Sequence, residues 1–236
     1  MTVELPHAAI PVRGRVVAEA SGVAVTALLL AGVLTGGTVM VREPLGLDAG
    51  VVRRLRADVA RTGAYVVASA DGATATTRST AGELPQFDAT VPMDVLPLYA
   101  VAATRAAGEC VLSASDGSAA EWTPLLVQLG LGVCVDGESI VVSPGLGEPA
   151  GVVDHDGDVR VVLTALLVAL LQPGVHVVDT TPLDVFPGFL DRWTVLLEAD
   201  EYLLPGSALL PSDYVRSGDS GNVSLSGRVL GSSRVD

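Results

Sequence analysis

The amino-acid sequence predicts an α/β (α+β) protein built from three βαβαββ repeats. Three apolar stretches of helical length end at Gly37, Gly108 and Gly174, at nearly even spacing along the chain. A β-prone run follows each of these glycines, and a second helical stretch follows each run. Because this order recurs, each copy is expected to be one unit that packs against its neighbours. The uncharged helices are expected inside, with the charged helices outside.

The first repeat contains every element of this order, from a strand through two helices to a hairpin. Its hairpin signal is Asp71-Gly72 between two β-prone runs, because glycine accepts the positive φ that tight primed turns require. The expected elements are a strand over residues 14–18, an apolar helix that ends before Gly37, a strand over 38–41, a helix over 51–62 capped by Gly63, and strands over 65–69 and 73–77.

The second repeat shows the same signals, including Asp136-Gly137 between two β-prone runs. In the third repeat, an apolar helix over 161–171 precedes a strand over 175–178 and a helix over 186–199. The expected later elements of the second repeat are a strand over 110–112, a helix over 121–129 capped by Gly130, and strands over 133–135 and 139–142.

The composition fits a folded globular protein, since 49% of the 236 residues are hydrophobic and 17% are charged. We expect residues 1–205 to form a single domain. From residue 206 onward Ser, Gly and isolated charges predominate, so 206–236 is expected to be a flexible tail. The expected repeats cover about residues 11–80, 81–145 and 146–205.

The formal net charge of −13 opposes binding to nucleic acid and to anionic lipid, because both require clustered cations. Arg53, Arg54 and Arg56 form the densest basic group, and a solvated helix face explains them better than a phosphate site. The uncharged run over residues 21–41 is long enough to raise the question of a membrane span. Gly36-Gly37 interrupts it, so a core helix followed by a buried strand is the better explanation.

The sequence predicts neither a metal site nor a cofactor. Cys110 and Cys134 are isolated in apolar surroundings and are expected to be small buried side chains. The acidic run over residues 154–158 lacks the glycine spacing of a calcium loop, so a solvated acidic turn explains it better. No apolar run follows a basic start at the N-terminus, which argues against a signal peptide and makes the cytoplasm the expected compartment.

Two motifs near the end of the chain carry a family resemblance. Residues 157–160 (Gly-Asp-Val-Arg) open an apolar helix, and residues 186–189 read Phe-Pro-Gly-Phe. This order resembles the end of the enolpyruvyl transferases, above all the EPSP synthases, in which Asp-His-Arg opens a buried helix and Lys-Ser-Phe-Pro-Gly-Phe follows. Asp158 and Arg160 match the first motif, whereas Asp184 stands where the family has lysine.

The resemblance extends over roughly residues 11–200. Residues 11–16 resemble the opening strand of the family, and residues 27–31 resemble the helix after its Pro-Gly-Ser-Lys-Ser signature. A complete enzyme of the family has two inside-out α/β domains of three units each, with its active site in the cleft between them. The resemblance therefore implies one such domain, in a truncated and degenerate member of the family.

The resemblance also implies candidate site residues for a small molecule of the phosphoenolpyruvate type. Asp94, within residues 92–95, resembles the family's Pro-Asp-Ala-Ala stretch, whose aspartate acts in proton transfer. A carboxylate at the mouth of an apolar helix is partly desolvated, which suits a general acid or base. A helix N-cap is the alternative role of Asp94, and the two roles are compatible.

Asp158, Arg160 and Ser21 are the candidate substrate-binding residues. In the family, the arginine of the first motif binds the carboxylate or phosphate of phosphoenolpyruvate, and bidentate hydrogen bonds suit a guanidinium to this task. The alternative is a helix N-terminus capped by Asp158, with Arg160 paired to that cap or to Asp156. Ser21 lies where the family has its Lys-Ser signature.

The chain contains no lysine, so all 14 of its cationic side chains are arginine. Each lost cation removes a charge-assisted contact of about 1.5–3 kcal/mol. The first hypothesis is therefore an EPSP-synthase-like enzyme with standard transfer to shikimate 3-phosphate impaired or lost, whose cleft is completed in a homodimer. The second is a non-catalytic descendant that binds a ligand or partner. The third is a repurposed enzyme that uses Asp94 for proton transfer on a less anionic molecule.

Overall fold

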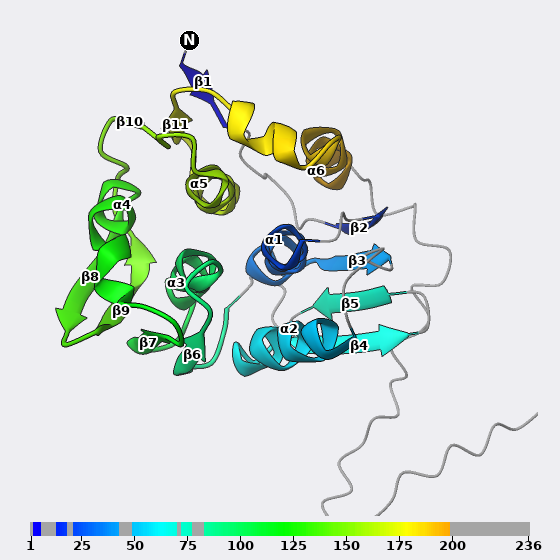
Figure 1. Cartoon of the computed structure of the whole chain (residues 1–236), viewed down its shortest axis with the longest axis horizontal. Helices are drawn as coiled ribbons and strands as arrows, with labels where there is room; N and C mark the ends of the chain where they lie inside the picture. Colours follow the sequence, from blue (N-terminus) through cyan, green and yellow to red (C-terminus); the bar gives the residue numbers. More distant parts are fainter. Residues whose placement is uncertain are drawn as a thin grey trace, which may run out of the picture. The chain divides into compact units, whose positions relative to one another are not determined.

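The computed structural model describes residues 2–5, 13–17, 21–42, 49–69, 72–76 and 83–198. The predicted tail over 206–236 lies outside these residues and stays a prediction, as does the turn at Asp71. In chain order (Figure 1) the elements are β1 (Val3–Glu4), β2 (Arg13–Val17), α1 (Gly22–Leu34), β3 (Thr38–Arg42), α2 (Ala49–Arg61), β4 (Tyr65–Ser69), β5 (Gly72–Thr76), β6 (Ala89–Val91), α3 (Leu96–Ala103), β7 (Cys110–Ala114), η1 (Ala119–Trp122), α4 (Thr123–Gln128), β8 (Leu131–Asp136), β9 (Ser139–Leu146), β10 (Val152–Val153), α5 (Val159–Leu171), β11 (His176–Val177), η2 (Thr181–Val185) and α6 (Phe189–Glu198).

The core is formed by three uncharged or nearly uncharged helices, α1, α3 and α5, which contact one another. Figure 1 shows them nearly end-on beside one another. Every residue of α3 is buried, as are the residues of α1 from Ala24 to Leu34 and those of α5 from Val161 to Leu170. A helix that is apolar on all sides requires such surroundings, because each of its faces must be kept from water. The predicted inner position of these helices is therefore confirmed.

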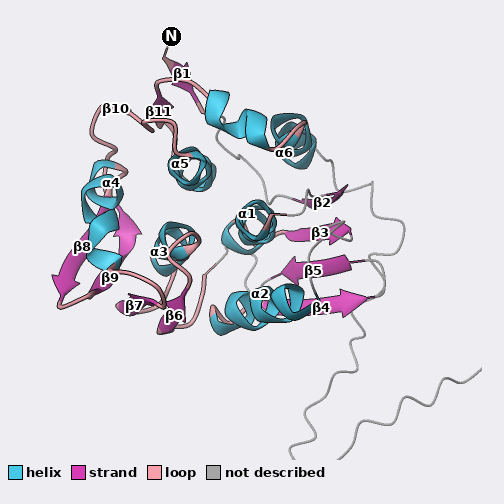
Figure 2. Ribbon diagram, in the orientation of Figure 1, coloured by secondary structure: helices cyan, strands magenta, loops and turns pink. Residues whose placement is uncertain are grey.

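Two four-stranded sheets share one topology, with strand orders β2-β3-β5-β4 and β6-β7-β9-β8 (Figure 2). In each sheet the first two strands are parallel across a helical connection, and the last two form an antiparallel hairpin. The described parts of both units thus have the predicted βαβαββ order. The predicted caps Gly63 and Gly130 have φ of 80° and 87°, which glycine adopts without steric strain.

The third sheet differs from the other two. It has three strands in the order β1-β11-β10, and no hairpin follows α6 within the described residues up to 198. Its middle strand β11 pairs in parallel with β10 and antiparallel with β1, with Val177 opposite both Val153 and Val3. The N-terminal strand therefore takes the place beside the middle strand that β5 and β9 take in the other units. Within the described residues, the complete βαβαββ order is present in two of the three predicted repeats.

Both cysteines are free thiols, but only one is buried. Cys110 lies in the core, whereas Cys134 on β8 is exposed, so the prediction that both are buried was wrong. Cys134 pairs with Val141 across the hairpin, on the opposite side of β8 from Val133 and Val135. Successive strand residues face opposite sides of a sheet, so an apolar run does not by itself bury all of its members.

Among the described residues, none of the helices combines the length and the apolar character needed to cross a bilayer. Within the same part of the chain, His, Cys, Asp and Glu side chains form no group of three or more that could hold a metal ion.

Candidate functional site

The first turn of α5 and the turn before α3 meet at an ion-paired cluster of Asp94, Asp158 and Arg160. Arg160 Nη1 donates to Asp94 Oδ1 at 2.7 Å. Arg160 Nη2 donates to Asp158 Oδ2 at 2.6 Å, and Nε lies 3.0 Å from each oxygen of the same carboxylate. The structure therefore brings together three of the four side chains that the sequence selected as site residues.

Asp158 is placed by the local structure at the start of α5. The turn before the helix contains two left-handed residues, Asp156 with φ of 44° and Gly157 with φ of 78°. Asp158 follows in an extended conformation as the N-cap, and its Oδ1 accepts the Arg160 backbone N–H at 2.8 Å. The alternative role of Asp158, a helix cap paired to Arg160, is thus what the structure shows.

Arg160 changes the ionisation of its capping partner. Burial alone would raise the pKa of Asp158, but the hydrogen bonds and the charge of Arg160 outweigh burial and hold this pKa below its usual range. Reciprocally, the hydrogen bond to Asp158 is the main cause of a raised pKa at Arg160, and Asp94 adds to it. Asp158 and Arg160 are therefore both charged at neutral pH.

Asp94 lies in the turn before α3 and does not cap that helix. The N-cap is Val95, which has no side-chain cap, so the alternative role of Asp94 as an N-cap was wrong. The turn is held by Asp116, whose Oδ1 accepts the Met93 backbone N–H at 2.7 Å. The Asp94 side chain is 64% exposed, so it is not the desolvated carboxylate that the sequence suggested.

Trp122, the last residue of η1, covers one face of the guanidinium. The Arg160 Cζ atom lies 5.0 Å from the centroid of the Trp122 ring, within the range of a cation–π interaction. Trp122 is only 8% exposed, and its Nε1 has no hydrogen-bond partner among the described residues. Arg160 is thus held by two carboxylates and by an aromatic face.

The cluster has a net formal charge of about −1, because two carboxylates surround one guanidinium. Nε, Nη1 and Nη2 of Arg160 each have a carboxylate partner, which leaves one N–H on Nη1 and one on Nη2. An incoming carboxylate would therefore find a guanidinium that is largely occupied and a second carboxylate, Asp94, beside it. Asp94 therefore lowers the affinity of the site for an anion, because it occupies one N–H of Nη1 and places a second negative charge beside the guanidinium.

Comparison with solved structures relates the fold of the chain to known proteins. The chain is similar to the enolpyruvyl transferase NikO from Streptomyces tendae, with a TM-score of 0.60, 24% sequence identity, and coverage of 76% of this chain and 43% of that protein. The chain has the fold of an enolpyruvyl transferase domain. An EPSP synthase from Acinetobacter baumannii also matches, with a TM-score of 0.48, 17% identity, and coverage of 72% of this chain and 44% of that one. The chain thus spans less than half the length of either structure.

The predicted enolpyruvyl transferase resemblance is thus confirmed at the level of the fold. Neither the scan against protein-family models nor the search of curated proteins finds a match to the sequence.

Ser21, the fourth predicted site residue of this enolpyruvyl transferase fold, lies at the start of α1. Its side chain caps that helix, with Oγ accepting the Ala24 backbone N–H at 3.4 Å. In the described part of the chain, Ser21 has no hydrogen bond to Asp94, Asp158 or Arg160. Its role in substrate binding stays a prediction.

Sequence reasoning missed a second polar cluster beside the turn that carries Asp158. His155 is buried, its Nδ1 accepts the Gly157 N–H at 3.0 Å, and its Nε2 lies 3.2 Å from Asp179 Oδ1. An Nδ1 acceptor requires the neutral tautomer with its proton on Nε2, which can then donate to Asp179. Hydrogen bonds from Thr181, and then His155, lower the pKa of Asp179. His155 therefore ties the turn before α5 to the segment before η2.

Proposed function

We propose that the chain is a ligand-binding, enolpyruvyl-transferase-like domain that does not carry out standard transfer of an enolpyruvyl group to shikimate 3-phosphate. Its ligand is a small carboxylate with less negative charge than phosphoenolpyruvate. The observation that carries the proposal is the 2.7 Å contact between Arg160 Nη1 and Asp94 Oδ1. With Asp158 also bound to the guanidinium, Asp94 competes with a ligand carboxylate for Nη1 and adds a second negative charge beside it.

Electrostatics favours a weakly anionic ligand. Phosphoenolpyruvate brings a phosphate as well as a carboxylate to a cluster that is already negative, and like charges at short distance repel. The chain has no lysine to offset this repulsion, and Asp184 stands in place of the lysine of the resembling motif. Each missing charge-assisted contact removes about 1.5–3 kcal/mol of binding free energy, which is roughly a tenfold to hundredfold loss of affinity.

Calorimetry with pyruvate and with phosphoenolpyruvate tests the proposal. We expect the wild-type chain to bind pyruvate more tightly than phosphoenolpyruvate, and Arg160→Gln to lose both. Asp94→Asn removes a negative charge and leaves only a weaker amide acceptor for Nη1, so it should raise the affinity for phosphoenolpyruvate about tenfold. Asp136→Asn, in the β8–β9 hairpin, removes the same charge away from the cluster and should change neither affinity.

A phosphate-release assay with phosphoenolpyruvate and shikimate 3-phosphate completes the test. We expect no release above background. Turnover that Arg160→Gln abolishes would contradict the proposal, and so would tight phosphoenolpyruvate binding by the wild-type chain that depends on Arg160. The turnover result would restore standard enolpyruvyl transfer as the function, and the binding result would remove the preference for a less anionic ligand.

The exposure of Asp94 favours a second candidate function. Its carboxylate is held by Arg160 yet is open to solvent, which leaves it accessible to a molecule bound beside the guanidinium. This supports a repurposed enzyme that acts on a less anionic substrate. A metabolite screen that compares the wild-type chain with Asp94→Asn discriminates the two functions, because unchanged turnover would dismiss Asp94 as the proton-transfer group.

The remaining hypothesis is that a second copy of the chain supplies the other wall of the active-site cleft. In the resembling family the active site lies between two domains, and a homodimer would supply both from one sequence. Sedimentation that shows only monomers at working concentration would remove this hypothesis. The cytoplasmic location and the absence of nucleic-acid binding also stay predictions.

A further inference from the structure

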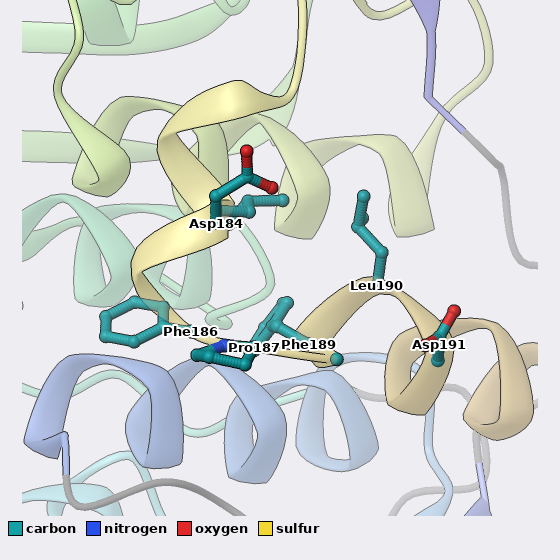
Figure 3. Close-up of a pocket in the computed structure, with 8 residues that line it drawn as sticks. Asp184, Phe186, Pro187, Phe189, Leu190 and Asp191 are labelled. Carbon is teal, nitrogen blue, oxygen red and sulfur yellow. The ribbon is translucent and has the colours of Figure 1, made fainter.

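The turn between η2 and α6 forms a pocket of about 400 Å³ (Figure 3), within the size range of small-molecule sites. None of its lining residues belongs to the Arg160 cluster. The lining comes from one continuous segment: Leu183, Asp184, Phe186, Pro187, Gly188, Phe189, Leu190 and Asp191. We propose that this pocket binds a small organic cation with an apolar body, such as an arylalkylammonium ion, independently of the Arg160 site.

The apolar part of the pocket is supported by aromatic rings that pack against one another. Phe189 is 2% exposed, and its ring stacks on that of buried Trp193 with centroids 5.8 Å apart and planes inclined by 24°. Phe186 lies beside it, with ring centroids 6.2 Å apart. Because Phe189 is itself buried, the aromatic surface that the pocket offers to an apolar group is the partly exposed ring of Phe186, with Phe189 beside it.

The rim of the pocket is also apolar. Leu190 lines it and is 37% exposed, and the neighbouring Val185 is 63% exposed. In Figure 3, Asp184 and Leu190 rise from the two arms of the turn on the same side, with Phe189 below and between them. A ligand held between these two side chains would therefore meet an aliphatic group on one side and a carboxylate on the other.

The charges around the pocket favour a single positive charge on the ligand. Asp184 has no ion pair with any described residue. Asp191 is followed by Arg192, whose Nη2 would lie 3.8 Å from a Cβ atom at Gly188, on the same turn. The N-terminus of α6 adds a partial positive charge of about half a unit, less than the full negative charge on Asp184. Asp184, Asp191 and Arg192 together carry one net negative charge, which one cation would complement.

Intrinsic fluorescence can test this site, because Trp193 stacks on Phe189, which lines the pocket. The only other tryptophan is Trp122, so a Trp122→Phe background leaves Trp193 as the sole reporter. We expect benzylammonium to give a saturable change, and benzyl alcohol and benzoate to give weaker ones. Asp184→Asn should weaken benzylammonium binding up to about fivefold, since an exposed ion pair contributes up to about 1 kcal/mol. Asp136→Asn is the matched control and should have no effect.

Three results would overturn the proposal. The first is no saturable response to benzylammonium. The second is equal binding of benzyl alcohol or benzoate, which would show an apolar pocket without charge selectivity. The third is concentration-dependent self-association, measured by sedimentation, that Val185→Ser abolishes, because the rim would then be an interface between copies. Asp184 is exposed, so an unchanged unfolding midpoint of Asp184→Asn would confirm that a lost response reports binding rather than folding.

Discussion

Asp94 and Arg160 contact each other at 2.7 Å although 66 positions separate them in the sequence. The contact joins the turn before α3 to the first turn of α5, and these helices belong to different repeats. Asp94 is largely exposed, whereas Arg160 is anchored by Asp158 and Trp122. The pair therefore consists of a fixed cation and a carboxylate that can move away from it with little loss of fold stability.

Removal of the Asp94 charge should change binding far more than stability. An ion pair with one exposed partner contributes about 0.2–1 kcal/mol, so Asp94→Asn is expected to lower the free energy of unfolding by less than about 1 kcal/mol. Urea unfolding at pH 7 measures this change. A loss of several kcal/mol would assign Asp94 a structural role and would remove it as a mobile competitor for Arg160.

Asp158 should contribute more, and in a pH-dependent way. Asp158→Asn keeps a side-chain oxygen for the N-cap but removes the charge that binds Arg160, so a loss of about 1–2 kcal/mol is expected at pH 7. Because the pKa of Asp158 is lower in the folded state than its ordinary value of 3.8, this stabilisation is complete above pH 3.8. It is lost as the pH falls through the folded-state pKa.

Urea unfolding of wild type and Asp158→Asn at several pH values measures this dependence. The two unfolding free energies should differ at pH 7 and pH 5 and should converge at the acid end. Asp136→Asn provides a control for general charge effects. A difference between wild type and Asp158→Asn that stays constant down to pH 2 would show that the charge of Asp158 does not stabilise the fold.

The sequence predicted those parts of the fold that depend on local signals. The apolar run after Ser21 gave α1, and Asp136-Gly137 gave the β8–β9 hairpin, because caps and tight turns are specified by adjacent residues. The pairing of Val3 with Val177 carries no such local signal. A two-residue strand cannot be predicted from local sequence, because it is defined only by its pairing with a distant strand.

In the candidate site, too, the sequence predicted some features but not the contacts between distant segments. Resemblance placed Asp94, Asp158 and Arg160 in one site, and the structure brings them together. The resemblance did not reveal that both carboxylates bind the guanidinium, because this contact depends on the relative position of two separate repeats. Trp122 was expected only as part of a helix, and no spacing in the sequence connects it to Arg160.

Tyr99, in the middle of α3, has a fully buried side chain whose hydroxyl has no hydrogen-bond partner among the described residues. Burial raises the pKa of this hydroxyl, which is therefore neutral at all ordinary pH values. An unpaired buried polar group is destabilising, so Tyr99→Phe should raise the free energy of unfolding by up to about 1 kcal/mol. Thermal or urea unfolding measures the change, and a clear loss of stability would indicate that the hydroxyl has a partner.

Gly32 in α1 allows that helix to lie close against β3. A Cβ atom at this position would lie 2.8 Å from Val39 Cγ2 and 2.9 Å from the Val39 backbone nitrogen. The second contact is with backbone in a strand and cannot be relieved by a side-chain rotation. Gly32→Ala should therefore lose about 1–3 kcal/mol of stability through overpacking, which exceeds the roughly 1 kcal/mol gained from the helix propensity of alanine.

Gly22, at the start of the same helix, provides the matched control. A Cβ atom there would have Leu55 Cδ1 as its nearest neighbour at 3.8 Å, an ordinary van der Waals distance. Gly22→Ala should therefore be neutral or stabilising by up to about 1 kcal/mol. Urea unfolding of both variants measures the two changes in the free energy of unfolding. Equal effects of the two substitutions would mean that α1 can move away from Val39, and that the close approach of this helix to β3 is not required by the fold.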